Sequence, residues 1–131
     1  MAELRILSYN CDKGNCKLAP GKVSYIGNII TQANADIVCL QEYSQTVAQQ
    51  LLPYRLEESY IFITSPINQG WSENIIYSKL PILKSWFVEM DGKNRKSPII
   101  TVQTSNGPIT IACIHLDFEE ICCGWELAPI S

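Results

Sequence analysis

The sequence predicts an α+β (mixed α/β) domain, and two observations support that fold class. In the first half, an alternating segment at residues 4–10, a helical segment at 20–33 and an apolar segment at 36–42 follow one another. Strand, helix and strand in that order make a βαβ unit with parallel strands and a right-handed crossover. In the second half, several β-type segments succeed one another, which predicts antiparallel strands. A βαβ unit followed by antiparallel strands is typical of an α+β fold.

The three N-terminal segments differ in pattern. Residues 4–10, LRILSYN, place Leu4, Ile6, Ser8 and Asn10 on one face and the intervening side chains on the other. Turn formers and charges predict a loop over 11–20, and Pro20 suits the first turn of the helix. Apolar residues then recur at helical spacing, namely Val23, Ile26, Ile30 and Ala33. Residues 36–42, DIVCLQE, are almost continuously apolar, as expected of a buried strand.

The second half is predicted to be mainly strands. Weaker patterns suggest a short helix at 43–52 and a strand or hairpin over 54–58 and 60–64. Clearer strands are predicted at residues 72–78, 81–89, 98–104 and 109–115.

The last two predicted strands flank Asn106–Gly107, which is the strongest short hairpin signal. A two-residue turn at this dipeptide pairs Thr104 with Ile109, Val102 with Ile111, and Ile100 with Cys113. All six residues then lie on one face, and His115 continues that face at the end of the strand.

Composition excludes several classes of protein. The chain has 131 residues, enough for one domain, and its 47% hydrophobic and 18% charged residues exclude a disordered chain. Ten Lys and Arg residues against 13 Asp and Glu exclude a nucleic-acid binder held by charge alone. An enzyme acting on phosphates is still possible, because bound metal ions can supply positive charge. We expect a cytoplasmic protein with reduced cysteines, since no signal peptide or membrane-spanning apolar run is present.

Five pieces of the sequence, in this order and spacing, carry a family resemblance. They are SYN (8–10), ADIVCLQE (35–42), SENIIYSKLPI (72–82), Arg95 and ITIACIHLD (109–117). Together they resemble the endonuclease/exonuclease/phosphatase superfamily over about residues 3–118. The resemblance implies a four-layered α/β sandwich, of which this chain matches the N-terminal half. It also implies Mg²⁺-dependent hydrolysis of phosphodiester or phosphomonoester bonds, with Mn²⁺ as a possible substitute.

The resemblance assigns roles to three residues. Glu42 matches the family's metal-binding glutamate, and a carboxylate suits Mg²⁺. Asn10 matches an asparagine that orients the phosphate or a water, and His115, the only histidine, matches one that lies beside the scissile phosphate. From local pattern alone, Glu42 and His115 are better explained as polar residues that end a strand, and Asn10 as one that starts the following turn. Arg95 and Asp117 are weaker candidates, because a bracing or solvated position is favoured for Arg95 and a surface position for Asp117. Asn74 occupies a position where the family often has a small residue or an asparagine, and it is the weakest candidate.

The chain departs from the family after residue 118. Members usually continue to a Gly-Asp-Xaa-Asn motif and a Ser-Asp-His motif, and neither occurs here. We therefore expect a single truncated domain over 1–131 with an unassigned tail at 119–131, inactive or nearly so by itself. The alternatives are a non-catalytic binding or interaction remnant of the same fold, and an unrelated small α+β domain.

The resemblance also suggests partners. The substrate would be a phosphoester, with nucleic acid slightly favoured because many members act on it. The family's second half supplies a second sheet, so we expect a partly bare apolar face here. That face comprises Ile100, Val102, Ile109, Ile111 and Cys113. Such a face predicts self-association or a complementing second half.

The six cysteines suggest two uses. Cys39 and Cys113 lie within apolar strands and are most simply core residues. A zinc site is the less favoured interpretation of Cys11, Cys16, Cys122 and Cys123, because their spacing matches no common zinc pattern.

Overall fold

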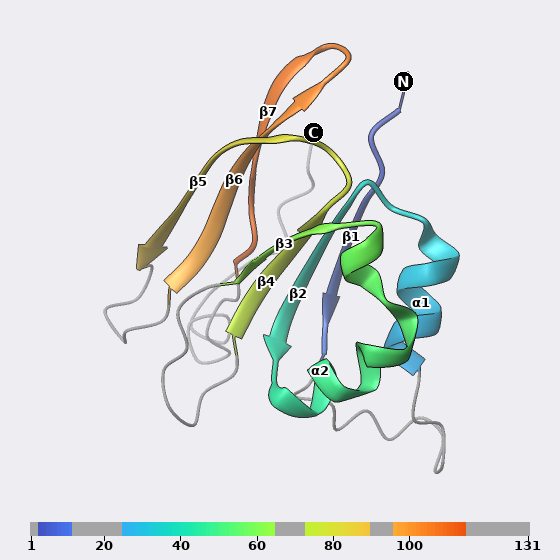
Figure 1. The fold of residues 1–131 in the computed structure, drawn as a ribbon. Helices are drawn as coiled ribbons and strands as arrows, with labels where there is room; N and C mark the ends of the chain where they lie inside the picture. Colours follow the sequence, from blue (N-terminus) through green and yellow to red (C-terminus); the bar gives the residue numbers. More distant parts are fainter. Residues whose placement is uncertain (1–2, 12–24, 65–72, 90–95, 115–131) are drawn as a thin grey trace, which may run out of the picture.

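The computed structural model describes residues 3–11, 25–64, 73–89 and 96–114. These residues form a mixed α+β fold with two sheets and few helices (Figure 1). The first sheet has the order β1-β2-β4-β3 and the second the order β5-β6-β7. The strands are β1 (Ile6–Asn10), β2 (Ile37–Tyr43), β3 (Ile61–Thr64), β4 (Glu73–Ser78), β5 (Ile82–Glu89), β6 (Lys96–Thr104) and β7 (Gly107–Ala112). The helices are α1 (Tyr25–Ala33) and α2 (Gln45–Leu51), with 3₁₀ turns η2 (Leu52–Tyr54) and η3 (Leu56–Glu58).

The predicted βαβ unit is confirmed. Strands β1 and β2 pair in parallel, from Ile6 opposite Ile37 to Asn10 opposite Gln41, and α1 lies between them in the chain. Strand β4 pairs antiparallel with β2, and β3 pairs antiparallel with β4. The predicted helix over 20–33 is confirmed from residue 25 onward, and residues 20–24 lie outside the described part.

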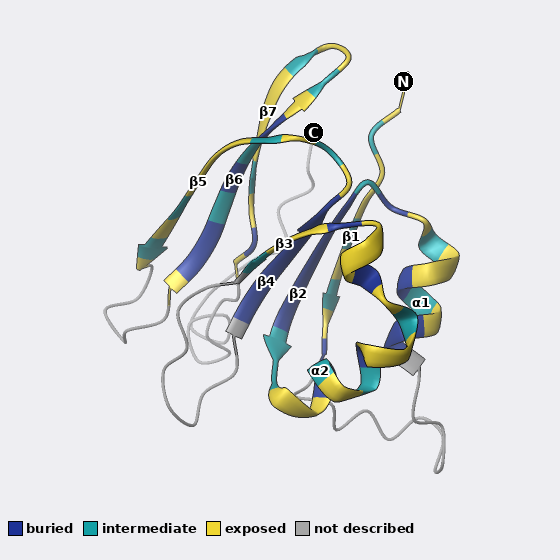
Figure 2. Cartoon of the chain, in the orientation of Figure 1, coloured by how far each residue is buried: buried dark blue, intermediate teal, exposed yellow. Residues whose placement is uncertain are grey.

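The molecule has three layers, with the first sheet in the middle (Figures 1 and 2). On one face of this sheet, Val38, Leu40 and Ile75 pack with buried residues of α1 and α2. On the other face, Ile37, Cys39 and Ile76 pack with buried residues of the second sheet. Strands β2 and β4 are therefore buried on both faces, which explains their nearly continuous apolar sequences.

The face that we expected to be partly bare is mostly covered. Ile100 and Val102 are fully buried and Cys113 is 1% exposed, because β2 and β4 supply the opposing apolar surface. The prediction was wrong for these residues, since it assumed that only a missing half could cover them. It holds near the hairpin tip, where Ile109 is 39% exposed.

The segment after α2 differs from the prediction. The α2 helix begins after Ser44, whose Oγ accepts a hydrogen bond from the Val47 amide at 3.3 Å. The strand suggested over 54–58 was wrong, because the chain makes two 3₁₀ turns there. Pro53 donates no backbone hydrogen bond, and Arg55 adopts a left-handed conformation with φ 49°, so neither suits a strand ladder. The strand suggested over 60–64 is confirmed as β3.

The β6–β7 hairpin is present, but its register differs from the prediction. Thr104 pairs with Gly107, Val102 with Ile109 and Ile100 with Ile111, so each partner shifts by two residues. The turn residues are Ser105 and Asn106, and the Thr104 hydroxyl both accepts from the Asn106 amide (3.1 Å) and donates to the Gly107 carbonyl (2.6 Å). Gly107 has φ 112°, which only glycine adopts readily. A shift of two preserves the face of each side chain, so the apolar pattern alone could not distinguish the two registers.

Candidate functional site

The carboxyl ends of β1 and β2 bring two predicted site residues to one edge of the first sheet. Asn10 ends β1, and its register partner is Gln41, the residue before Glu42. The pairing continues past the strand, because the Cys11 amide donates to the Gln41 carbonyl at 2.8 Å. Asn10 is exposed and Glu42 is half-buried. The prediction that these strands end together is confirmed for Asn10 and Glu42.

A β-bulge lies at Glu42. Leu40 pairs with Ile75 and Tyr43 pairs with Glu73, so Gln41 and Glu42 together lie opposite the single residue Asn74. Glu42 has φ 52°, a left-handed conformation that costs a non-glycine residue about 1–2 kcal/mol. Bulges of this kind re-aim side chains and are over-represented beside active sites. The bulge therefore places Glu42, in a left-handed conformation, at the end of β2 where Asn10 ends β1.

Gln41 connects three segments around this edge. The residue is 8% exposed, and its side-chain Nε2 donates to Ser8 Oγ at 3.1 Å and to Cys113 Sγ at 3.5 Å. The Cys113 thiol in turn donates to the Leu40 carbonyl at 3.6 Å. The chain that follows β7 therefore reaches the carboxyl end of β2. His115 comes two residues later in the sequence and lies outside the described residues.

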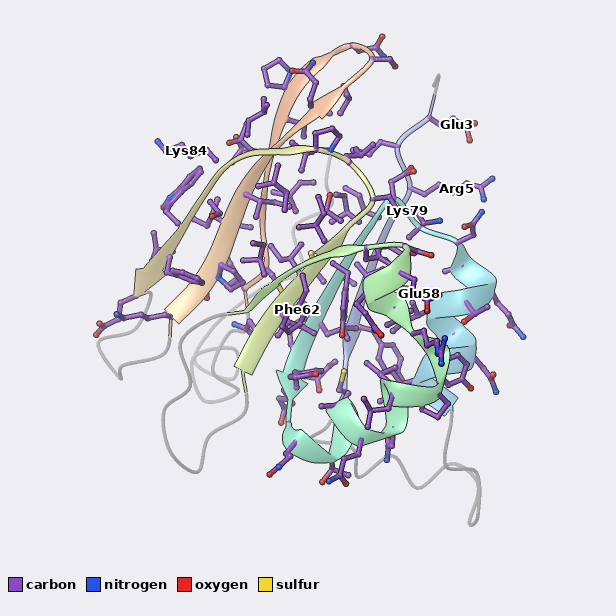
Figure 3. All side chains as sticks on the ribbon, in the orientation of Figure 1. Glu3, Arg5, Glu58, Phe62, Lys79 and Lys84 are labelled. Carbon is purple, nitrogen blue, oxygen red and sulfur yellow. The ribbon has the colours of Figure 1, made fainter. Side chains whose placement is uncertain are left out.

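The weaker candidates have different positions. Asn74 is buried, and its Nδ2 donates to Ser97 Oγ at 3.4 Å, so that it links β4 to β6. Asn74 thus lies opposite the bulge and links the two sheets. Arg95 and Asp117 lie outside the described residues. Two basic side chains, Arg5 and Lys79, lie at the other end of these strands, away from Asn10 and Glu42 (Figure 3). Arg5 precedes β1, and Lys79 follows β4, which runs antiparallel to β2.

Cys11 lies close to the candidate site but belongs to the core. It is 1% exposed and packs in the cluster beneath the helices. Burial first, and then the negative charge of Glu42, raises the pKa of the Cys11 thiol to about 12. A thiol with so high a pKa stays protonated near neutral pH. The burial of Cys11 among apolar residues fits a core position. The other three cysteines of the zinc interpretation lie outside the described residues.

The oxygen donors at this edge suit a hard cation. Glu42 offers a carboxylate and Asn10 an amide oxygen, and Mg²⁺ commonly takes one or two carboxylates while keeping several waters. In the described part of the chain, no three His, Cys, Asp or Glu side chains gather into a metal-binding group. Glu42 and Asn10 are the residues at this edge that could contribute oxygen ligands to such a cation.

Sequence reasoning missed Gln41 and Ser8 as members of this site. Both lie inside motifs that carried the resemblance, SYN and LQE. The available signal was geometric: Ser8 shares a face with Asn10, and a parallel register that aligns the two strand ends brings Gln41 beside both.

Comparison with known proteins identifies the family of this chain. A family profile, described as the Endonuclease/Exonuclease/phosphatase family, matches residues 7–127. The chain therefore belongs to this family. Members of known structure and related fold include TDP2 and ANGEL2. None of the curated proteins compared with the chain matched its sequence significantly.

Three solved structures illustrate the likeness. TDP2 from D. rerio, complexed with a single-strand DNA product, is 21% identical with a TM-score of 0.67, and the match covers 86% of this chain and 45% of that one. A family protein from Leptotrichia buccalis is 14% identical with a TM-score of 0.65, covering 92% and 56%. ANGEL2, a 2',3'-cyclic phosphatase bound to adenosine-2',3'-vanadate, is 17% identical with a TM-score of 0.57, covering 83% and 40%. The chain thus spans about half the length of such relatives.

Among the described helices, none is long and apolar enough to cross a membrane.

Proposed function

We propose that this chain carries the N-terminal part of a Mg²⁺-dependent phosphoesterase site, which acts on phosphodiester or phosphomonoester bonds. The observation that carries the proposal is the placement of Asn10 and Glu42 together at the carboxyl edge of β1 and β2. Ligand sites of α/β sheets collect at such edges. Family membership supports the reaction class, since the family comprises nucleases and phosphatases.

In this proposal each residue has a distinct role. Glu42 holds the metal ion, which would supply charge stabilisation and polarise the phosphoryl oxygen. Asn10 orients the phosphate through its amide group. His115 donates a hydrogen bond or a proton to the charge that develops on the phosphate. The Gln41–Cys113 hydrogen bond supports this role for His115, because Cys113 directly follows β7 and contacts the carboxyl end of β2.

We propose that the chain by itself hydrolyses phosphoesters weakly or not at all. Water activation by a general base is commonly worth about 10²–10⁴-fold. The chain has one histidine, and it lacks the two later motifs from which the family draws the base. A complementing half, or a second copy, would pack along an outer strand of one of the two sheets, which are β1 and β3 in the first sheet and β5 and β7 in the second. Ile6 on β1 and Ile61 on β3 are 50% and 47% exposed, so both outer strands of the first sheet offer exposed apolar side chains.

The substrate we favour is nucleic acid, and single-stranded DNA is a practical probe. TDP2 was crystallised with a single-strand DNA product, and its fold is similar over most of this chain. Binding of a short 5'-phosphorylated, fluorescein-labelled oligonucleotide can be followed by anisotropy, with Mg²⁺ or with EDTA. Hydrolysis of bis-4-nitrophenyl phosphate is measured in parallel samples.

We expect the oligonucleotide to bind only when Mg²⁺ is present, and Asn10→Ala to weaken binding about 10-fold through loss of a hydrogen bond to a charged group. Asn106→Ala, in the exposed hairpin turn, is the matched control and should bind as wild type does. Hydrolysis should stay near background in all samples. Binding that is equally tight in EDTA and unaffected by Asn10→Ala would favour the non-catalytic binding module instead.

A further inference from the structure

We infer that Gln41 is the positioning residue of this site: it fixes Asn10 and Glu42 relative to each other without touching substrate. The inference rests on the proposed function, and it extends that function to a residue with no assigned role. Gln41 is the register partner of Asn10 and the chain neighbour of Glu42. It is thus the residue common to both strand ends.

Gln41 holds β1 on both sides of Asn10. Its carbonyl accepts from the Cys11 amide at 2.8 Å, one residue after Asn10. Its side-chain Nε2 donates to Ser8 Oγ at 3.1 Å, two residues before Asn10. These two bonds are anchored in one residue, so the backbone that carries the Asn10 amide cannot shift along β2 without breaking one of them.

Gln41 also forms half of the bulge that directs Glu42. Two residues, Gln41 and Glu42, oppose Asn74, and Glu42 takes a φ of 52° that few non-glycine residues adopt. Such conformations persist only where the surrounding structure over-determines them. The buried Gln41 side chain, fixed at Ser8 and at Cys113, supplies part of that constraint.

Both N–H groups of the Gln41 side-chain amide donate a hydrogen bond. An amide nitrogen has two hydrogens, and here one bond goes to Ser8 and the other to Cys113. The first bond reaches the first sheet at β1, and the second reaches the segment just after β7. Replacing the amide releases both contacts together, whereas a change at Ser8 releases one contact and leaves Gln41 in place.

The test compares Mg²⁺ affinities by isothermal titration at matched stability. Ser8 is exposed, so Ser8→Ala should leave the thermal midpoint within a few degrees of wild type while removing one acceptor. Loss of a group that orients a metal ligand typically costs about 10–100-fold in affinity, and we expect about 10-fold for Ser8→Ala. Ser8→Thr retains the hydroxyl and should restore wild-type affinity. Gln41→Met, similar in shape but without the amide, should weaken binding at least as much as Ser8→Ala.

Ser8→Ala separates positioning from stability, because a merely structural bond would lower the thermal midpoint without changing the affinity of the folded protein. The inference is overturned if wild type binds Mg²⁺ and both Ser8→Ala and Gln41→Met bind it equally tightly. It is overturned as well if Ser8→Thr binds as weakly as Ser8→Ala. Absence of saturable Mg²⁺ binding in wild type is a different result, because it removes the proposed function itself.

Discussion

Glu42→Gln should abolish saturable Mg²⁺ binding while the chain stays folded. The substitution keeps the size of the side chain and an oxygen donor, and it removes the negative charge that a hard cation requires. Glu42 is the residue of the bulge, and its half-buried carboxylate lies beside the end of β1. The neutral glutamine keeps the same backbone conformation, so unfolding by urea should change little. Isothermal titration with MgCl₂, at one protein concentration and ionic strength, measures the effect.

Glu89→Gln is the matched control for this prediction. Glu89 also ends a strand, β5, and is exposed, but it belongs to the second sheet. Its replacement changes the net charge by the same amount and should leave the Mg²⁺ affinity as in wild type. Equal Mg²⁺ affinities of Glu42→Gln and wild type would show that Glu42 is not the metal ligand.

Ile76→Ala should lower the free energy of unfolding by about 2–5 kcal/mol, the usual cost of emptying a core isoleucine site. Ile76 is fully buried in β4, where it contributes to the cluster that joins the two sheets. Its neighbour Ile75 is fully buried against the helices, so β4 is constrained on both faces and cannot move into the cavity. Urea unfolding followed by circular dichroism measures the loss.

Two further variants serve as controls for this measurement. Ile76→Val removes one methylene group and should cost about 0.5–1.5 kcal/mol, which keeps the test informative if the alanine variant does not fold. Ile61→Ala, on the neighbouring strand β3, concerns a side chain that is 47% exposed, and it should cost about 1 kcal/mol or less. A loss at Ile76 no larger than the loss at Ile61 would mean that the two sheets do not share a packed core.

The sequence predicted the elements whose signals are local. Strand β2 has a continuous apolar segment, and α1 has apolar residues at helical spacing, so both were located within a few residues where the structure describes them. The hairpin turn was located, but its register depends on which residues take the turn conformation, and Gly107 rather than Asn106 carries the positive φ. The contact between the two sheets was not predicted, because pairing of faces such as those of Ile76 and Ile100 depends on long-range packing.

The site was predictable in part. Parallel pairing alone indicates that Asn10 and Glu42 share an edge, and the structure confirms this. The bulge was not predictable, because the segment LQE shows no glycine or other local signal of a left-handed residue. The role of Gln41 depends on that bulge and on Cys113, a residue 72 positions away in the chain. Contacts over such distances are not encoded in any local pattern.

In the proposed function, His115 acts together with Asn10 and Glu42 on the same phosphate. His115 is the only histidine, so its imidazole gives one assignable set of proton resonances. The most direct measurement is an NMR titration of these resonances with MgCl₂, in wild type and in Glu42→Gln. We expect these resonances to move saturably in wild type and to stay in place in the variant. Saturable Mg²⁺ binding by wild type with unmoved His115 resonances would contradict this expectation.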